Sequence, residues 1–277
     1  MTRFVLCADD FAMTDGVSRA ILELLASRRI SATGAMTNRQ GWPGWAHSLM
    51  VYAGRADLGV HLNLTCASPL SPMRTLCPGG EFPPLGRVVR AALISAAVRR
   101  EIAAEIARQL DAFEQATGRE PDFVDGHQHV HALPGVRALA LAEIARRYRA
   151  GSVYVRDPSD SLKAIRDRGV AVRKAFVISA LASGFGAKAR ALGLPVNEGF
   201  SGVSSFDAAR DFIRDMRSFA SSPGPRHLVM CHPGHVDEEL KRLDPVVASR
   251  PVEFEALRRG MGLEGHQIVR FNALRAA

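Results

Sequence analysis

Short apolar segments alternate with longer amphipathic segments along the whole chain, and this alternation restricts the folds that the chain can adopt. The predicted strands are residues 4–8, 32–37, 58–64, 123–126, 152–156, 227–231 and 268–271. The predicted helices are residues 15–27, 99–116, 134–148, 205–219 and 252–260. Strands that alternate with helices in this way are typical of repeated βα units. We therefore expect an α/β fold built on a largely parallel sheet.

The chain shows no break that would divide it into parts. Its 277 residues fit the size of a single α/β barrel, and neither an internal repeat nor a composition shift marks a boundary. We expect one domain over residues 1–277. Residues 65–84, rich in Pro, Gly and Ser, exceed a routine connection and are predicted to form a binding loop above the barrel.

The spacing of the cysteines and the length of the apolar segments bear on where in the cell the protein is located. Cys7, Cys66, Cys77 and Cys231 form neither a CxxC pair nor an evenly spaced disulfide framework. The chain enters a strand-like run at Phe4, without the basic region and apolar stretch of a secretory signal. No segment reaches the roughly 18 apolar residues that span a bilayer. These features favour a cytoplasmic protein.

The net charge of +8 raises the question of an anionic partner. Most positive charges are arginines scattered over helical stretches, and aromatic residues make up only 6% of the chain. The interleaved basic and aromatic residues that stack nucleic-acid bases are missing. We therefore expect no nucleic-acid partner.

Four polar segments lie at the ends of predicted strands, at residues 8–11, 59–64, 125–131 and 231–235. They hold six of the nine histidines. Enzymes with parallel α/β sheets build their active sites at the carboxyl ends of the strands. We expect the four segments to meet in one site.

Asp9 and Asp10 directly follow an apolar strand. Because successive strand residues point to opposite sides, one carboxylate can bind a metal while its neighbour handles a proton. Aspartate is also common as a helix cap, and a cap before the helix at residues 15–27 is the alternative.

His61 lies in an otherwise apolar run, two residues before Asn63. A lone histidine in such a run is more often a core residue than a ligand. If His61 does reach the site, Asn63 is expected to face the same cavity.

Residues 125–131 carry the strongest local signal. His127, His129 and His131 would share one face of an extended segment, and clustered neutral imidazoles commonly hold a divalent ion. In a helix, His127 and His131 would still share a face. Asp125 can orient a ligating ring. Histidines that hydrogen-bond loop carbonyls are the structural alternative.

His232 is followed by Pro233 and Gly234, which turn the chain and would leave the imidazole at the rim of the site. This position suits a proton donor or an oxyanion partner, and a simple turn histidine is the alternative. Cys7 and Cys231 fit small core residues better than nucleophiles, because neither has a setting that would activate a thiolate.

These residue types together fit metal-dependent hydrolysis. One aspartate and two histidines leave coordination positions open, so the ion can polarise a carbonyl and lower the pKa of bound water. A second carboxylate can deprotonate that water. A nearby acid can then protonate the departing amine.

Several motifs follow one another in a family-specific order. They are Ala8-Asp9-Asp10-Phe11, Gly59-Val60-His61, Gly118-Arg119-Glu120-Pro121 running into Asp125-Gly126-His127-Gln128-His129-Val130-His131, and Met230-Cys231-His232-Pro233-Gly234. In this order they resemble the YdjC/ChbG-type carbohydrate deacetylases, a family that includes hopanoid-associated members called HpnK. The resemblance implies an incomplete or distorted TIM-like (β/α) barrel that hydrolyses acetamido groups on sugars such as chitooligosaccharides.

The resemblance also implies a metal site. Asp10, His61 and His127 match the ligands of a divalent ion, which in the family is often magnesium. Ligand softness instead favours zinc or another transition ion for such a set, so both kinds of metal stay open.

The remaining roles follow from the same resemblance. Asp9 matches the general base, and His232 is assigned as the acid or oxyanion residue, with His129 as its rival. The residues expected to support the ligands or contact substrate are Asp125, His129, His131, Asn63 and Arg156. Ala12 stands where the family usually has glycine, and Gly126 where serine is common. These two departures affect loop geometry and hence the choice of substrate.

Two other functions compete with deacetylation. A metal-dependent hydrolase of a phosphoester or another amide would often show a second metal cluster or several basic anchors, and Arg156 is the one anchor we find at a strand end. A catalytically silent sugar-binding protein should have lost Asp9 or a metal ligand, and this chain keeps them.

Residues 85–100 mix apolar side chains with Arg87, Arg90, Arg99 and Arg100. This pattern fits an interfacial helix that touches anionic lipid or, alternatively, a barrel helix with a solvated basic edge. Together with the net charge it leads to the hypothesis of a lipid-linked or glycolipid N-acetylamino sugar as substrate. A homodimer is expected from the family alone.

Overall fold

The computed structural model describes residues 2–274 and confirms the predicted α/β fold. The strands are β1 (Thr2–Phe11), β2 (Ala32–Ala35), β3 (Asp57–Leu62), β4 (Phe123–Gly126), β5 (Tyr154–Val155), β6 (Phe200–Ser201), β7 (Leu228–Cys231) and β8 (His266–Ile268). They form one sheet in the order β5-β4-β3-β2-β1-β7-β6, and β8 pairs with the start of β1. The pairings are parallel.

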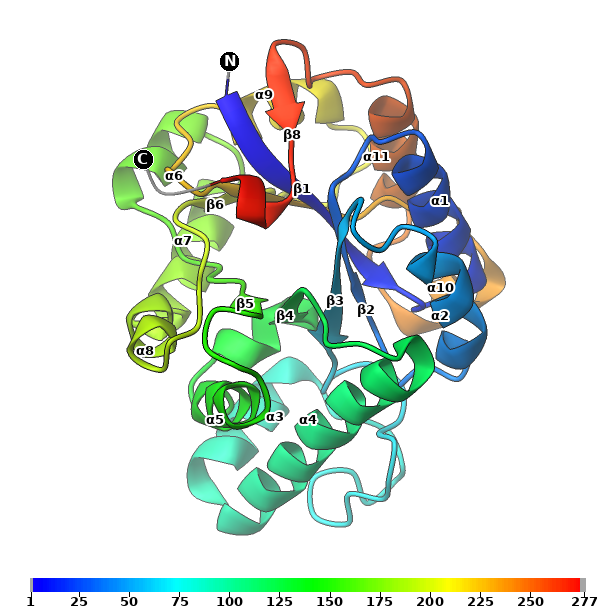
Figure 1. Ribbon diagram of the computed structural model, residues 1–277, viewed down its shortest axis with the longest axis vertical. Coiled ribbons are helices and arrows are strands. Elements are labelled where there is room, and N and C mark those ends of the chain that lie inside the picture. The colour runs from blue at the N-terminus through cyan, green and yellow to red at the C-terminus, as the bar shows by residue number, and fades with distance from the viewer. Residues whose placement is uncertain (1, 275–277) are drawn as a thin grey trace.

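The sheet curls into a half-barrel, which confirms the expected distorted, TIM-like architecture (Figure 1). At the β5 edge of the sheet, the pairing recorded within the described residues is one isolated bridge between Val155 and Val196. Because this bridge does not lead into β6 as a regular ladder, the barrel is incomplete on that side.

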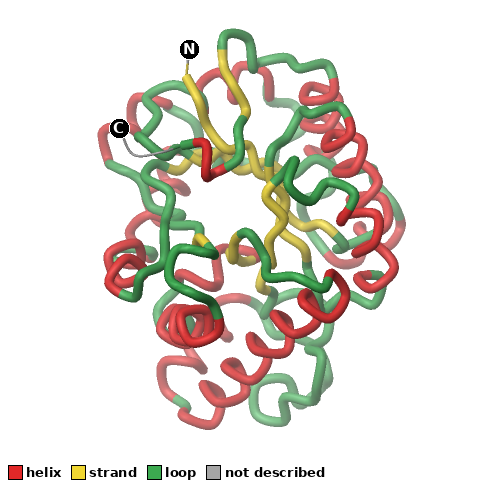
Figure 2. The backbone as a smooth tube through the Cα atoms, viewed as in Figure 1, coloured by secondary structure: helices red, strands yellow, loops and turns green. Residues whose placement is uncertain are grey.

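Helices surround the strands on the outside (Figure 2). They are α1 (Asp15–Ala26), α2 (Trp42–Met50), α3 (Leu85–Ile94), α4 (Ala96–Thr117), α5 (Arg137–Arg147), α6 (Leu162–Arg168), α7 (Val172–Leu181), α8 (Phe185–Ala191), α9 (Phe212–Phe219), α10 (Glu238–Leu243) and α11 (Ser249–Arg258). Two 3-10 helices, η1 (His127–Ala132) and η2 (Phe271–Ala273), complete the set.

The alternation of side chains along β1 separates two apolar layers. Phe4 and Leu6 belong to the large core that packs against the outer helices. Val5 and Cys7 face the interior of the half-barrel, with Phe123, Tyr154 and Leu228 from other strands. Phe271 of η2 stacks on Tyr154 with ring centroids 3.9 Å apart and fills this interior.

Several predicted boundaries were wrong. The helix expected at residues 134–148 begins at Arg137, so Pro134 precedes it. The helix expected at residues 205–219 begins only at Phe212, where the side chain of Asp211 accepts a hydrogen bond from the amide of Arg214 and caps the helix. The prediction also missed β6, α2, α6, α7, α8 and α10, most of which are short.

Residues 85–100 form two helices rather than the single helix we expected. The break lies at Ser95, whose hydroxyl accepts a hydrogen bond from the amide of Val98 and caps α4. Arg99 turns back and donates to the carbonyls of Ala92 and Leu93 at the end of α3. One of the arginines of this segment therefore closes a helix end.

Residues 65–84 lie against α4. Glu101 accepts hydrogen bonds from the amides of Thr75 and Leu76, and Glu105 accepts one from Leu70. None of these loop residues lines the cavity of the candidate active site, so the binding role expected for the loop stays a prediction.

Over residues 2–274, no helix combines the length and the apolar character needed to cross a membrane.

Candidate active site

Asp9 and Asp10 lie at the carboxyl end of β1, where the pairing of β1 with β2 shifts register between Ala8 and Phe11. Asp10 adopts a left-handed backbone with φ of 70°. Regular alternation would have sent the two carboxylates to opposite sides, as we expected. Both instead border the same cavity, because the irregular backbone turns Asp10 toward its neighbour's side.

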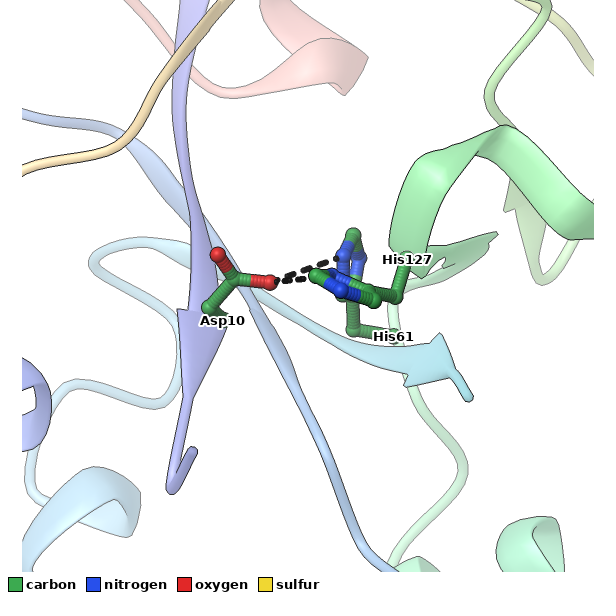
Figure 3. A group of neighbouring side chains, drawn as sticks. All are labelled: Asp10, His61 and His127. Atoms are coloured by element: carbon green, nitrogen blue, oxygen red, sulfur yellow. Dashed lines mark hydrogen bonds and ion pairs between the residues drawn. The ribbon is translucent and has the colours of Figure 1, made fainter. Parts of the chain in front are cut away.

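Asp10, His61 and His127 converge at one point (Figure 3). The Oδ1 atom of Asp10 lies 2.8 Å from Nδ1 of His127 and 3.4 Å from Nε2 of His61. All three residues are buried, and one ligand atom from each lies within 4.8 Å of the others. The group comes from β1, β3 and the start of η1, which brings together three of the four predicted segments.

Asp125 holds His61 from behind. The parallel register places His61 opposite Asp125, and Nδ1 of His61 lies 2.7 Å from Oδ1 of Asp125. Burial would raise the pKa of Asp125, but Arg156 and His61 outweigh it and lower the pKa to about 2. The ionised carboxylate accepts from Nδ1, so Nε2 of His61 points toward Asp10.

The surroundings of His61 favour a positive charge. Burial would lower the pKa of His61, yet Asp125, Asp9 and Asp10 together raise it to about 10. The three carboxylates around this buried imidazole therefore favour a positive charge at this point of the site.

Arg156 links the two other carboxylates of the site. Its guanidinium donates to both oxygens of Asp9, at 2.7 and 2.5 Å, and lies 2.5 Å from Oδ2 of Asp125. Cys7, Asp9 and Asp125 form a second group with metal-ligand spacing. Because the Arg156 guanidinium contacts all three of these side chains, this second group already holds a cation of the protein itself.

His232 follows β7 and borders the same cavity. Its Nε2 atom lies 4.0 Å from Oδ2 of Asp9, and its backbone amide donates to Oε2 of Glu253 at 2.6 Å. Burial lowers the pKa of His232 to about 4, against the opposing pull of Asp9 and Asp10. The imidazole is therefore neutral at neutral pH.

The cavity that joins these groups has a volume of about 640 Å³. Asp9, Asp10, His61, His127 and His232 lie on its wall. Much of the remaining wall is apolar and comes from Leu85, Val177, Ile178, Val203, Phe206, Met230, Pro245 and Val246.

The sequence profile described as YdjC-like protein matches residues 3–260 of this chain. The chain belongs to the YdjC-like protein family. A carbohydrate deacetylase from Brevibacillus brevis is 29% identical over 259 residues, which cover 92% of this chain and 90% of that relative. A carbohydrate deacetylase from Geobacillus stearothermophilus is 34% identical over 148 residues, and this match spans only 56% of that relative's length.

A solved structure shares the fold. A candidate cellobiose-phosphate cleavage protein from Enterococcus faecalis V583 superimposes with a TM-score of 0.75. The two chains are 22% identical, and the alignment covers 99% of this YdjC-like chain and 98% of the other.

The three histidines of residues 127–131 do not share a face in this YdjC-like chain. The segment is a kinked 3-10 helix rather than extended, with left-handed φ angles of 53° at Gln128 and 58° at His129. His127 contacts Asp10 and His129 packs edge-on against Phe200, and both residues border the cavity. Nε2 of His131 lies 2.7 Å from the carbonyl oxygen of Arg156. The kink therefore separates the three rings.

Asn63 does not face the cavity, contrary to our expectation. Its Oδ1 atom accepts from the amides of Thr65 and Cys66, and its Nδ2 atom donates to Asn38 and to the carbonyl of Cys66. The side chain is fully buried and holds the turn that follows β3.

Sequence reasoning missed Arg250 and Glu253 on α11, and Asp244 just after α10. Arg250 donates to Oδ2 of Asp10, and Glu253 holds the amide of His232. In the sequence, Arg250 and Glu253 look like any charged pair spaced i,i+3 on a helix, so no local signal marks them as part of the site.

Proposed function

We propose that this YdjC-like chain is a metal-dependent hydrolase that removes the acetyl group from an N-acetylated amino sugar. One observation carries the proposal: Asp9, His232 and the cluster of Asp10, His61 and His127 border a single cavity. Relatives that share most of the chain are named carbohydrate deacetylases, which supports a sugar as substrate.

Asp10, His61 and His127 are the residues that would hold a divalent cation. Their donor atoms fit one, because the Asp125 carboxylate fixes the His61 ring and three carboxylates make its surroundings attractive to positive charge. A cation bound there supplies Lewis acidity to the acetamido carbonyl and to a water molecule. An Asp-His-His set favours zinc or another transition ion by ligand softness, and magnesium stays the family expectation.

Asp9 and His232 are proposed to handle the protons. Arg156 donates hydrogen bonds to both oxygens of Asp9, so the carboxylate keeps one orientation while it takes a proton from the attacking water. His232 starts neutral and lies 4.0 Å from Asp9, so the proton taken up by Asp9 is near the imidazole. From His232 it can pass to the departing amine nitrogen. His129 is less suited, because burial and the charge of Arg156 lower its pKa well below the usual histidine value and its ring packs against Phe200.

A phosphoesterase is the second candidate, and the site argues against it. Two-metal phosphoester hydrolysis needs a second ion close to the first. Within residues 2–274, the second group with ligand spacing surrounds the Arg156 guanidinium, which occupies the place of an ion.

The apolar walls support a substrate with a lipid-like part. α7 has no buried residue, and Val177, on the cavity wall, is 54% exposed. A second hollow of about 350 Å³ lies between α6 and α7 and shares Arg173 and Val177 with the cavity. A free oligosaccharide would gain little from such walls, because its hydroxyls need hydrogen-bonding partners. We therefore propose a lipid-linked or glycolipid N-acetylamino sugar whose apolar part lies along α7.

Acetate release tests the reaction. Metal-stripped protein is given Mg²⁺, Zn²⁺, Mn²⁺ or Co²⁺ and assayed on N-acetylchitooligosaccharides and on a lipid-linked N-acetylamino sugar. We expect metal-dependent release that Asp9→Asn and His232→Gln abolish. The matched controls Asp15→Asn and His235→Gln change an exposed and a half-buried residue that do not line the cavity, and they should keep full activity. Metal binding without acetate release from any sugar would contradict the proposal.

The lipid-linked substrate has its own test. Val177→Ser should raise KM for the lipid-linked sugar and leave turnover of a short soluble glycoside unchanged. Leu192→Ser, at an exposed apolar residue that does not line the cavity, is the control. Peripheral contact with anionic membranes, a cytoplasmic location, one domain over residues 1–277 and a homodimer remain proposals. Failure to co-sediment with anionic vesicles at low salt would exclude the membrane contact.

A further inference from the structure

α11 brings a buried arginine to the candidate ligand Asp10. Arg250 is 0% exposed. Its Nη2 atom donates to Oδ2 of Asp10 at 2.7 Å and to Oδ2 of Asp244 at 2.6 Å. Its Nε atom donates to the carbonyl oxygen of Val246 at 2.7 Å. One guanidinium thus joins Asp10 to residues 244–246, which line the cavity.

These contacts divide the two oxygens of Asp10 between two tasks. Oδ2 is engaged by Arg250, whereas Oδ1 faces His61 and His127. Asp10 also has a left-handed backbone with φ of 70°, which is unfavourable for a residue with a Cβ atom. Such strain persists only where the surroundings hold it, and Arg250 is a buried partner that does so.

The charges around Arg250 keep the site attractive to a cation. Arg250 alone would neutralise Asp10. Asp244 contributes a second carboxylate, so the three side chains together carry one net negative charge. A buried arginine with two carboxylate partners is also paired well enough to remain in place.

We propose that Arg250, held by Asp244, is a positioning residue that presents Asp10 to the cation through Oδ1 alone. The inference rests on the metal site proposed above. It assigns a role to α11, which no motif near the ligands reveals.

Cation affinity tests this role without any enzymatic assay. Metal-stripped wild type, Arg250→Met and Arg250→Lys are titrated with Zn²⁺ and Co²⁺ by calorimetry. Loss of a nearby positive charge alone would strengthen cation binding. Loss of a positioning partner should weaken it about 10- to 100-fold, so the sign of the effect separates the two. We expect weaker binding in both variants, and a changed visible spectrum of bound Co²⁺.

The controls separate positioning from folding. Arg258→Met removes an exposed arginine from the same helix and should bind cations like the wild type. If Arg250→Met does not fold, as judged by its thermal transition, Arg250→Lys carries the test, because it keeps the positive charge but loses the guanidinium contacts, and it should weaken binding about tenfold or more.

Two results would overturn the inference in distinguishable ways. Unchanged or tighter binding in folded Arg250 variants would overturn the positioning role and leave the metal site standing. A folded wild type that binds neither Zn²⁺ nor Co²⁺ would overturn the metal site and the positioning role together.

Discussion

Two of the three candidate ligands, His61 and Asp10, depend on a charged partner outside the ligand set. Asp125 holds His61, Arg250 holds Asp10, and Arg156 joins Asp125 to Asp9. The partners lie on β4, just after β5 and on α11, far apart in the sequence, so the geometry of the ligands is fixed by the fold as a whole. Substitutions of the partners should therefore lower metal affinity although the ligands themselves are unchanged.

Gly34 of β2 leaves the space in which His61 and Asp125 meet. A Cβ atom at this position would lie 3.0 Å from Oδ1 of Asp125 and 3.3 Å from Nδ1 of His61. We expect Gly34→Ala to push the pair apart and to lower Zn²⁺ affinity about tenfold or more, measured by calorimetry. Gly44→Ala in α2 meets nothing within 4 Å and should bind Zn²⁺ normally. Equal affinities in the two variants would contradict this view of Gly34.

Asp125→Asn tests the fixed orientation of the His61 ring. The neutral amide can no longer act as a charged acceptor for Nδ1, and it leaves Arg156 with one carboxylate fewer. We expect metal affinity to fall about 10- to 100-fold. Asp122→Asn is the comparison, because Asp122 pairs with Arg119 and Arg270 before β4 begins. That variant should lose stability but keep its affinity, and a loss of affinity in both would refute the specific role of Asp125.

At the scale of elements, strands were easier to predict than helices. Six of the strands were located because they lie in short, largely apolar buried runs, whereas the predicted strand at residues 268–271 overlaps β8 only at Ile268, since β8 is partly exposed and polar. α7 was missed since its apolar residues remain exposed and give no amphipathic stripe. The kink in η1 was missed because it depends on left-handed φ angles at two non-glycine residues, Gln128 and His129, where such angles are uncommon. The candidate ligands were proposed from their residue types, whereas the contact of Arg250 with Asp10 is visible only in the fold.

Gly118 ends α4 and begins the motif that leads into β4. Its φ is 69°, its amide donates to the carbonyl of Glu114, and a Cβ atom there would meet nothing within 4 Å. The cost of Gly118→Ala is therefore purely conformational, about 1 kcal/mol of unfolding free energy, measurable by urea denaturation. Gly86→Ala, in open space at the start of α3, should cost nothing or stabilise slightly. A Gly118→Ala variant as stable as the wild type would argue against this account of the helix end.

At the scale of the whole molecule, folding gathers the site from both ends of the chain. Asp10 comes from the first strand and Arg250 from the last helix, and both are buried. Charged groups this deep must titrate differently in the folded and unfolded chains, so global stability should depend on pH.

Glu253, in the middle of α11, offers the clearest case. Burial raises its pKa to about 7, and the amide of His232 and the charge of Arg250 oppose this only in part, while Asp9 and Asp215 add to the rise. The unfolded value is about 4.3. Between these two pH values the unfolded chain releases a proton that the folded chain keeps. The contribution of Glu253 to the free energy of unfolding therefore falls as pH rises to about 7, and it is constant above that.

Glu253→Gln removes this titration while keeping an oxygen that can accept from the amide of His232. Relative to the wild type, the variant should gain roughly 1–3 kcal/mol of unfolding free energy between pH 4 and pH 8, measured by urea denaturation. Glu255→Gln, at an exposed position on the same helix, should show no comparable trend between pH 5 and pH 8. A constant offset between Glu253→Gln and the wild type across this range would mean that the buried carboxyl is already ionised in the folded protein at pH 5, and that the amide of His232 and Arg250 outweigh its burial.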